Sequence, residues 1–153
     1  MPDPEAIEVT TSAIMSFAEK LEDDASKFYR EIAERYKKNP ETFQAFAKES
    51  ANNRVLLTRT YQETITDALE AGFSFRLFSL GGYLVDTTLA EDARYTDALK
   101  VALELEENAT RFYMDMAEQS RSLLATIPRA FNKVAENRGK RKLKLEMLLE
   151  ASN

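Results

Sequence analysis

Two glutamates in this sequence have near-identical surroundings. Glu22 belongs to LEDDASKFY and Glu106 to LEENATRFY, and the second segment repeats the first at an offset of 84 residues. Each glutamate follows an alanine by four residues and precedes a tyrosine by seven: Ala18 and Tyr29, Ala102 and Tyr113. On a helix, this spacing directs both carboxylates toward the buried side, near the edge of the apolar stripe. The pattern predicts two interior carboxylates that could bind a metal ion beside two tyrosines; the alternative places both on solvated helix edges.

A second repeat supplies the polar residues that would face these glutamates. Residues 43–47 (FQAFA) are similar to residues 131–135 (FNKVA) at an offset of 88. Each segment begins an inward-facing row that is apolar at both ends and polar in the middle. The polar positions fall seven and ten residues after the phenylalanine: Ser50 and Asn53, Arg138 and Arg141. A polar layer inside an otherwise apolar bundle is where such folds hold a cofactor. The alternative for both arginines is that their stems lie on the core while their charged ends reach water.

Two further acids lie within one turn of this polar layer. Glu49 and Glu136 follow the same phenylalanines by six and five residues. A rotation or slip of either helix would bring them inward, and a site of four carboxylates could hold manganese, magnesium or calcium. A metal-binding alternative therefore stays open, with Glu22, Glu106 and one or both of these acids as ligands.

The helices that must position these residues are long and rich in Ala, Leu, Glu and Lys. We predict four of them, with boundaries 11–37, 41–71, 90–120 and 127–151. The chain, 1–153, then forms a single domain of two helix pairs, 11–71 and 90–151, joined by a crossover at 72–89. This order predicts an all-α fold, a ferritin-like four-helix bundle of two helix pairs with a long crossover between helices 2 and 3. Because the crossover is strongly apolar, we expect it to lie against the helices or a partner chain, in a homodimer or a higher assembly.

Composition excludes several classes of site and partner. The sequence has no cysteine and no histidine, which excludes thiolate and imidazole metal ligands, iron–sulfur clusters and histidine-based catalytic triads. Its net charge of −5 disfavours nucleic acid and anionic membranes as partners, and we interpret the basic run at 138–144 as a solvated helix face. The N-terminus has neither the basic segment nor the apolar segment of a signal peptide, and no apolar run approaches the length of a membrane span. We therefore expect a cytoplasmic protein.

The two repeated elements resemble a known family. Glu-x2-Ala-x2-Phe-Tyr, present twice, is similar to the first and third helices of rubrerythrin-type ferritin-like proteins; Phe-x2-apolar-Ala, also present twice, is similar to the start of their second and fourth helices. The resemblance covers nearly the whole chain. It implies that a single glutamate from each of helices 1 and 3, here Glu22 and Glu106, would bind a di-iron centre completed by two Glu-x-x-His pairs. At the positions of those pairs the sequence has Ser50-x-x-Asn53 and Arg138-x-x-Arg141.

These replacements change the charge of the predicted site. In the family, four carboxylates balance two ferrous ions, whereas two glutamates and two arginines sum to zero without metal. A cation beside Arg138 and Arg141 would meet like charge, at a cost of several kcal/mol if the separation is about 4 Å and the effective dielectric constant about 20. We therefore predict that the glutamates pair with one or both arginines, with no metal or other cofactor. Ser50 and Asn53 would add hydrogen bonds.

The function predicted from the sequence is that of a rubrerythrin-related protein that has lost its di-iron centre. Its role would be structural, partner-binding or regulatory rather than catalytic. One alternative is a divergent carboxylate-metal (Fe or Mn) oxidoreductase of the rubrerythrin or ferritin type. Its ligands would be Glu22 and Glu106, with Glu49 or Glu136 as possible additional ligands. Another alternative is a small ligand bound in the emptied site.

Overall fold

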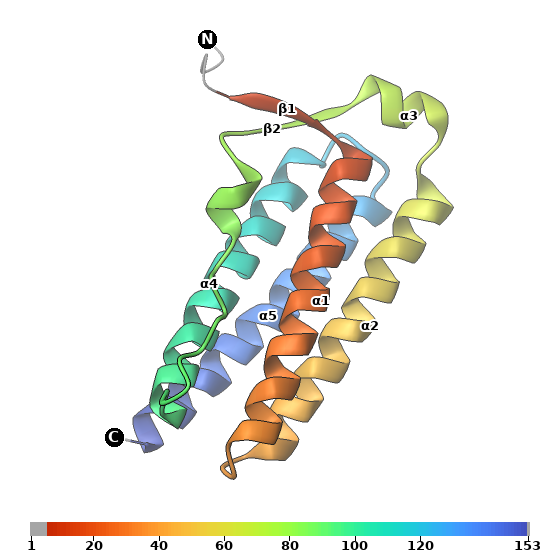
Figure 1. Cartoon of the computed structure of the whole chain (residues 1–153). Helices are drawn as coiled ribbons and strands as arrows, with labels where there is room; N and C mark the ends of the chain where they lie inside the picture. The colour runs from red at the N-terminus through yellow and green to blue at the C-terminus, as the bar shows by residue number, and fades with distance from the viewer. Residues whose placement is uncertain (1–5, 153) are drawn as a thin grey trace.

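A computed structural model gives the fold and describes residues 6–152. It is mostly helical, in agreement with the predicted all-α class. Four long helices lie side by side along their length (Figure 1): α1 (Thr11–Arg35), α2 (Pro40–Thr64), α4 (Tyr95–Gln119) and α5 (Thr126–Ala151). The other elements are short: β1 (Ile7–Thr10), α3 (Asp67–Gly72), β2 (Ser74–Leu77) and the 3-10 helix η1 (Leu80–Tyr83).

The long helices form two pairs. α1 packs along α2 and α4 packs along α5, each pair being joined by a short loop, and α2 also contacts α5. The connection from α2 to α4 is much longer. After β2 and η1 it runs back along α4 to the opposite end of the molecule (Figure 1), where the Tyr36 hydroxyl donates a 2.7 Å hydrogen bond to the Ala93 carbonyl. The chain therefore crosses the full length of the helices between its two pairs.

The helix predicted over 41–71 is divided in the structure. α2 ends at Thr64, and α3 begins after Thr66, whose hydroxyl accepts a 3.2 Å hydrogen bond from the Leu69 N–H. Thr66 thus caps a new helix, and the three consecutive β-branched residues 64–66 disfavour continuation of the first one. Downstream, β2 pairs with β1 as an antiparallel ribbon. The sequence analysis did not predict these two strands, which supplement the helical fold.

The helix predicted over 90–120 begins later, at Tyr95. The Asp97 carboxylate accepts a 2.9 Å hydrogen bond from the Arg94 N–H, which fixes the N-terminus of α4 there. The backbone carbonyls of residues 90 and 91 accept hydrogen bonds from the Arg35 guanidinium and stay outside the helix. The helices predicted over 11–37 and 127–151 match α1 and α5 to within two residues.

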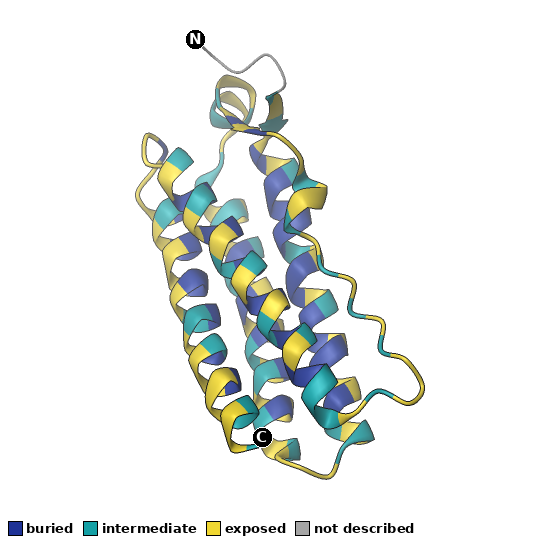
Figure 2. Cartoon of the chain, turned by 90° about the vertical axis from the view of Figure 1, so that its left-hand side faces the viewer, coloured by how far each residue is buried: buried dark blue, intermediate teal, exposed yellow. Residues whose placement is uncertain are grey.

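The interior holds two apolar clusters. The first, next to the β-ribbon, includes Phe17, Phe112 and Phe131, and the second includes Phe28 and Phe43. Figure 2 shows the buried residues gathered on the inward faces of the helices. Burial of these apolar faces is what holds the long helices together, since helices of this kind gain most of their stability from packing. The sequence-predicted polar residues lie between the two clusters.

The crossover is packed on the helices along part of its length. Phe75 is fully buried and Leu77 nearly so, whereas Phe78 and Leu84 are 66% and 42% exposed.

Within residues 6–152, no helix is both long enough and apolar enough to traverse a lipid bilayer.

Candidate functional site

All six polar positions singled out in the sequence meet in one layer across the middle of the four long helices. The six side chains are at most 3% exposed, and they come from all four helices: Glu22 (α1), Ser50 and Asn53 (α2), Glu106 (α4), Arg138 and Arg141 (α5). Neither the solvated-edge alternative for the glutamates nor the alternative of water-facing arginine heads agrees with this burial. We call these six residues the polar layer.

Arg138 joins the two glutamates. Its Nε donates a hydrogen bond to Glu106 and its Nη1 donates one to Glu22, and all three side chains are fully buried. Burial alone would lower the pKa of the Arg138 guanidinium, but the charges of Glu106 and Glu22 outweigh it and raise the pKa above its ordinary value. The guanidinium therefore stays charged and lies between two carboxylates, with the planar donor geometry that suits them.

Arg141 occupies the neighbouring turn of α5. Its Nη1 donates a 2.7 Å hydrogen bond to the Ser50 hydroxyl and lies 3.6 Å from Glu106, while its Nε donates a 2.7 Å hydrogen bond to Glu49. The guanidinium carbon lies 5.8 Å and 5.7 Å from the ring centres of Tyr29 and Phe46. Arg141 thus extends the polar layer toward the surface and stacks on aromatic rings on the way.

Two buried tyrosines complete the hydrogen bonding of the glutamates, each from the other helix. Tyr113 of α4 donates a 2.7 Å hydrogen bond to Glu22 of α1, and Tyr29 of α1 donates one to Glu106 of α4. Burial, followed by the charge of the adjacent glutamate, raises the pKa of both tyrosines well above the ordinary value of 10.0. Both hydroxyls therefore remain protonated donors at neutral pH. Sequence analysis identified these tyrosines but left open which glutamate each one contacts.

The layer keeps the internal symmetry of the sequence in part. Asn53 donates a 3.1 Å hydrogen bond to Glu22. In the second repeat the matched residues are Arg141, 88 positions after Asn53, and Glu106, 84 positions after Glu22, and their charged atoms lie 3.6 Å apart. The matched positions 50 and 138 differ: one is a serine, and the other is the arginine that bridges both glutamates. The repeat therefore places equivalent residues at equivalent points, while one half supplies both positive charges.

The donor set does not fit a di-iron centre. Each of the four oxygens of Glu22 and Glu106 already accepts at least one hydrogen bond, from Arg138, Asn53 or a tyrosine. Among residues 6–152, no three or more acidic, cysteine or histidine side chains are grouped so that they could hold a metal ion. A cation at this point would have to displace Arg138, and the guanidinium would then be buried without its carboxylates.

The two acids of the four-carboxylate alternative lie outside the space between the glutamates. Glu49 is 39% exposed and reaches the layer only through Arg141. Glu136 is 70% exposed and forms a 3.3 Å ion pair with Lys140 on the surface. The helices are therefore not rotated in the way that would make a site of four carboxylates.

Two donors of the layer have no hydrogen-bond partner among the residues that the structure describes. The Nη2 atoms of Arg138 and Arg141 are buried and make no hydrogen bond to residues 6–152. For Arg141 the nearby rings of Tyr29 and Phe46 offer a favourable contact. Phe46 belongs to the repeated Phe-x2-apolar-Ala element, so its spacing was a signal that it lies near the layer, but its role beside Arg141 was not foreseen.

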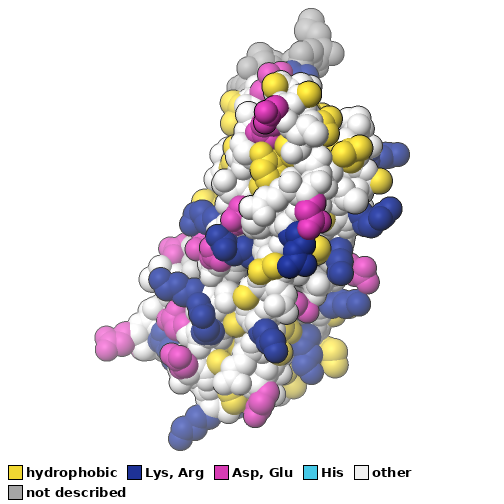
Figure 3. All heavy atoms as spheres, turned by 90° about the vertical axis from the view of Figure 1, so that its right-hand side faces the viewer, with side chains coloured by type: hydrophobic (Ala, Val, Ile, Leu, Met, Phe, Trp, Pro, Cys, Tyr) yellow, Lys and Arg dark blue, Asp and Glu magenta, His cyan; other side chains and the backbone are white. Residues whose placement is uncertain are grey.

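Acidic neighbours pair with two lysines of the basic run at 138–144. Of the basic run at 138–144, both arginines are buried, Lys140 pairs with Glu136, and Lys142 lies 3.5 Å from Glu107. The face shown in Figure 3 carries basic and acidic side chains interspersed with one another. The run therefore does not form a continuous basic patch.

Comparison of the chain with models of known protein families, with curated protein sequences and with solved structures found no match. The chemistry of the layer is thus the observation that bears most directly on function. Its two carboxylates are neutralised by arginine, and its tyrosines are fixed as hydrogen-bond donors to those carboxylates. The charged groups of the layer are therefore satisfied by other side chains of the layer and its two tyrosines.

Proposed function

We propose that this chain is a rubrerythrin-related, ferritin-like four-helix protein in which an internal ion-pair network replaces the di-iron centre, and that its role is structural, partner-binding or regulatory rather than catalytic. The observation that carries this proposal is the position of Arg138, buried between Glu22 and Glu106 and hydrogen-bonded to both. These are the glutamates that the resemblance assigns to iron.

Two features support the ferritin-like arrangement. The long helices pack as two pairs, α1 with α2 and α4 with α5, and the segment between the pairs runs the length of the molecule. The repeats at offsets of 84 and 88 residues bring matched positions of both halves to one central layer. A bundle with one long crossover and a central polar layer has this organisation.

Charge supports the loss of the metal. Glu22, Glu106, Arg138 and Arg141 sum to zero, so the buried layer needs no cation for neutrality. A buried ion pair offsets its desolvation cost only with good geometry and further hydrogen bonds, which the tyrosines, Ser50 and Asn53 supply here. A bound metal ion would break these contacts, and its positive charge would repel the two guanidinium groups.

The competing function is that of a carboxylate-metal (Fe or Mn) oxidoreductase, and metal content distinguishes the two. The chain would be produced in medium supplemented with iron and manganese and then analysed by inductively coupled plasma mass spectrometry, before and after anaerobic addition of Fe(II). We expect far less than one metal ion per chain in both samples. Stoichiometric iron or manganese that is lost in Glu22→Gln but kept in the surface variant Glu63→Gln would overturn the proposal.

We further propose that the chain forms a homodimer in the cytoplasm. Leu143 and Met147 are large apolar side chains of α5 that are each 63% exposed, and they could contribute to self-association. Light scattering coupled to size-exclusion chromatography measures the mass in solution. A mass of 17.4 kDa at all concentrations tested would show a monomer instead.

A further inference from the structure

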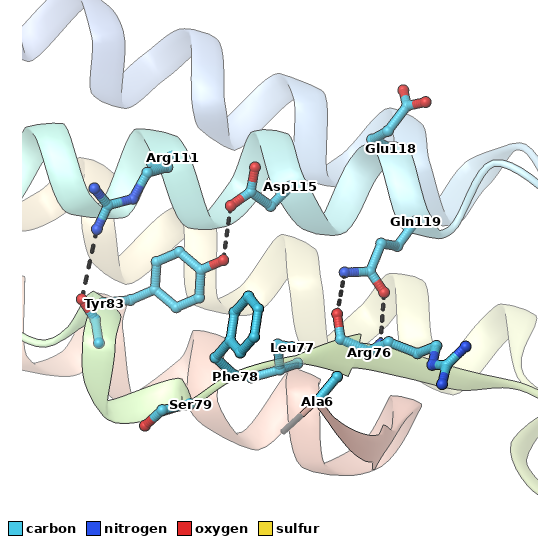
Figure 4. Close-up of a pocket in the computed structure, with 11 residues that line it drawn as sticks. Ala6, Arg76, Leu77, Phe78, Ser79, Tyr83, Arg111, Asp115, Glu118 and Gln119 are labelled. Atoms are coloured by element: carbon cyan, nitrogen blue, oxygen red, sulfur yellow. Dashed lines mark hydrogen bonds between the residues drawn. The ribbon is translucent and has the colours of Figure 1, made fainter. Parts of the chain in front are cut away.

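A surface cavity of about 490 Å³ lies between the crossover and α4, away from the polar layer (Figure 4). One wall is the face of α4 that carries Arg111, Asp115 and Gln119. The other wall consists of the end of β2 and η1, including Phe78 and Tyr83. A volume of this size is in the range of sites for small molecules, roughly 300–1,000 Å³.

Two opposite charges on this wall do not pair with each other. Arg111 and Asp115 are one turn apart on α4, a spacing at which opposite charges commonly pair, yet no ion pair within 4.0 Å forms between them. Tyr83 separates them: its hydroxyl donates a 2.7 Å hydrogen bond to Asp115 Oδ2, and its ring lies under the Arg111 guanidinium at 5.5 Å. Within residues 6–152, Asp115 has no cationic partner and Arg111 has no carboxylate partner.

Two other polar side chains of the cavity are already engaged. The Gln119 side chain hydrogen-bonds the backbone N–H and carbonyl of Arg76, at 2.6 Å and 2.5 Å. Glu118 pairs with Arg121 at 2.9 Å, and Figure 4 shows its carboxylate directed away from the cavity. Arg76 is a second cation of the lining, and Figure 4 shows its guanidinium beyond Gln119, directed away from Tyr83 and Phe78. The charges next to the two aromatic rings are therefore one cation and one anion on the same helix face.

The opposite wall offers apolar surface. The Phe78 ring rises from the end of β2 toward α4, beside Tyr83 (Figure 4), and 66% of the residue is exposed. The side chain of Leu77, largely buried, also lines the cavity. Exposed aromatic surface next to unpaired charges favours a ligand with an apolar body and a charged head.

We propose that this cavity binds a free α-amino acid with an apolar or aromatic side chain. The ligand ammonium would pair with Asp115, its carboxylate with Arg111, and its side chain would cover Phe78. A ligand with only one charge gains from one of the two protein charges and is repelled by the other, whereas a zwitterion gains from both. The site is independent of the metal question in the polar layer.

The test is a calorimetric titration of the full chain with four probes at neutral pH and low salt: L-phenylalanine, phenethylamine, 3-phenylpropanoate and glycine. We expect saturable 1:1 binding of L-phenylalanine. The cation-only and anion-only analogues each lack one charged hydrogen bond, and glycine lacks the apolar body. The affinity of each of these three probes should therefore be lower than that of L-phenylalanine by about tenfold or more. No saturable binding of L-phenylalanine, or equal affinity for all four probes, would overturn the proposal.

Single substitutions measure the contribution of each side chain of the proposed site to binding. Asp115→Asn keeps an acceptor for Tyr83 but removes the charge, and Arg111→Gln removes the guanidinium; each should weaken L-phenylalanine binding about tenfold. Phe78→Ala changes an exposed side chain and should also weaken binding, without affecting folding. Glu104→Gln, an exposed position of α4 outside the cavity, is the matched control and should leave affinity unchanged. Circular dichroism melting curves identify any loss that comes from unfolding, and unchanged affinity in the first three variants would contradict the assigned site.

Discussion

The hydroxyl of Tyr113 on α4 donates a 2.7 Å hydrogen bond to the carboxylate of Glu22 on α1, on the other helix pair. The equivalent tyrosine of the first repeat, Tyr29, makes the same contact in the opposite direction, to Glu106. The two pairs of helices are therefore tied through a reciprocal exchange of polar contacts, with Arg138 between the two carboxylates. Because each contact joins α1 to α4, the layer fixes how the two halves of the chain lie against each other, in addition to satisfying buried polar groups.

Removal of the bridging arginine should strongly destabilise the protein. Arg138→Met leaves two carboxylates buried without their cation, so we expect the free energy of unfolding to fall by about 3–5 kcal/mol in urea denaturation. The triple variant in which Glu22 and Glu106 are also changed to glutamine should recover much of that loss, since no charge is then left unpaired. The matched control is Arg54→Ala, whose exposed ion pairs on α1 contribute at most about 1 kcal/mol. Equal effects at both arginines would contradict the role given to Arg138.

The buried tyrosines should make the stability of the fold sensitive to alkali. Their pKa values are raised in the folded state, so their stabilising contribution is complete below about pH 10 and is lost as pH rises through the higher folded values. Tyr113→Phe and Tyr29→Phe should each cost about 1.5–3 kcal/mol at pH 7, the range for a hydrogen bond to a charged group. The double variant should then show a shallower fall in stability between pH 9 and 11 than the parent chain. Tyr95→Phe is the comparison variant: burial also raises the pKa of Tyr95, but its hydroxyl donates to the neutral Asn39 side chain, so both quantities should change less than in the buried pair.

Much of this arrangement could be predicted from the sequence because it depends on helical period. The offset of 84 residues indicated that Glu22 and Glu106 occupy matched inward positions, and the spacing after Phe43 and Phe131 indicated the polar positions that face them. These inferences need only that each segment is a helix with one apolar face. The structure brings all of these positions together.

The remaining contacts depend on how the helices shift along one another, which the period of a single helix does not determine. Tyr29 follows Glu22 by seven residues, about 10 Å along the same helix axis, so its hydroxyl must find a partner elsewhere, and that partner is Glu106. In the same way Arg138 and Arg141 are one turn apart, and their heights relative to α1 and α4 decide that Arg138 bridges the glutamates. The break of the second helix after Thr64 was missed because the cap at Thr66 is a local signal inside a strongly helical composition.

A carboxylate in α3 should make part of the stability depend on acid pH. Glu70 of α3 accepts hydrogen bonds from the Ser12 N–H at 3.1 Å and from the Tyr61 hydroxyl at 3.0 Å, so it holds α3 against α1 and α2. Partial burial by itself would raise the pKa of Glu70, but these hydrogen bonds lower it below its ordinary value. Its contribution is therefore present above the unfolded pKa of about 4.3 and is lost as pH falls through the lower folded value. Glu70→Gln should reduce stability at pH 7 by about 1 kcal/mol and flatten the decline in stability below pH 5. Glu63→Gln, on an exposed part of α2, is the control; a pH profile that is the same in all three proteins would show that Glu70 does not hold the crossover.

The outer edge of β2 should open when Gln119 is shortened. The Gln119 amide both accepts from the Arg76 N–H and donates to the Arg76 carbonyl, so it occupies the hydrogen-bonding positions that a third strand would take. Since Arg76 directs both backbone groups away from β1, its amide hydrogen depends on this side chain for protection from exchange. In Gln119→Ala we expect hydrogen–deuterium exchange at Arg76 to become at least tenfold faster, as the loss of about 1.5 kcal/mol of local hydrogen bonding implies. Gln119→Glu keeps the acceptor but loses the donor and should give an intermediate rate, while amides inside α1 should be unaffected in both variants. Unchanged exchange at Arg76 in Gln119→Ala would mean that β1 pairing alone protects the strand.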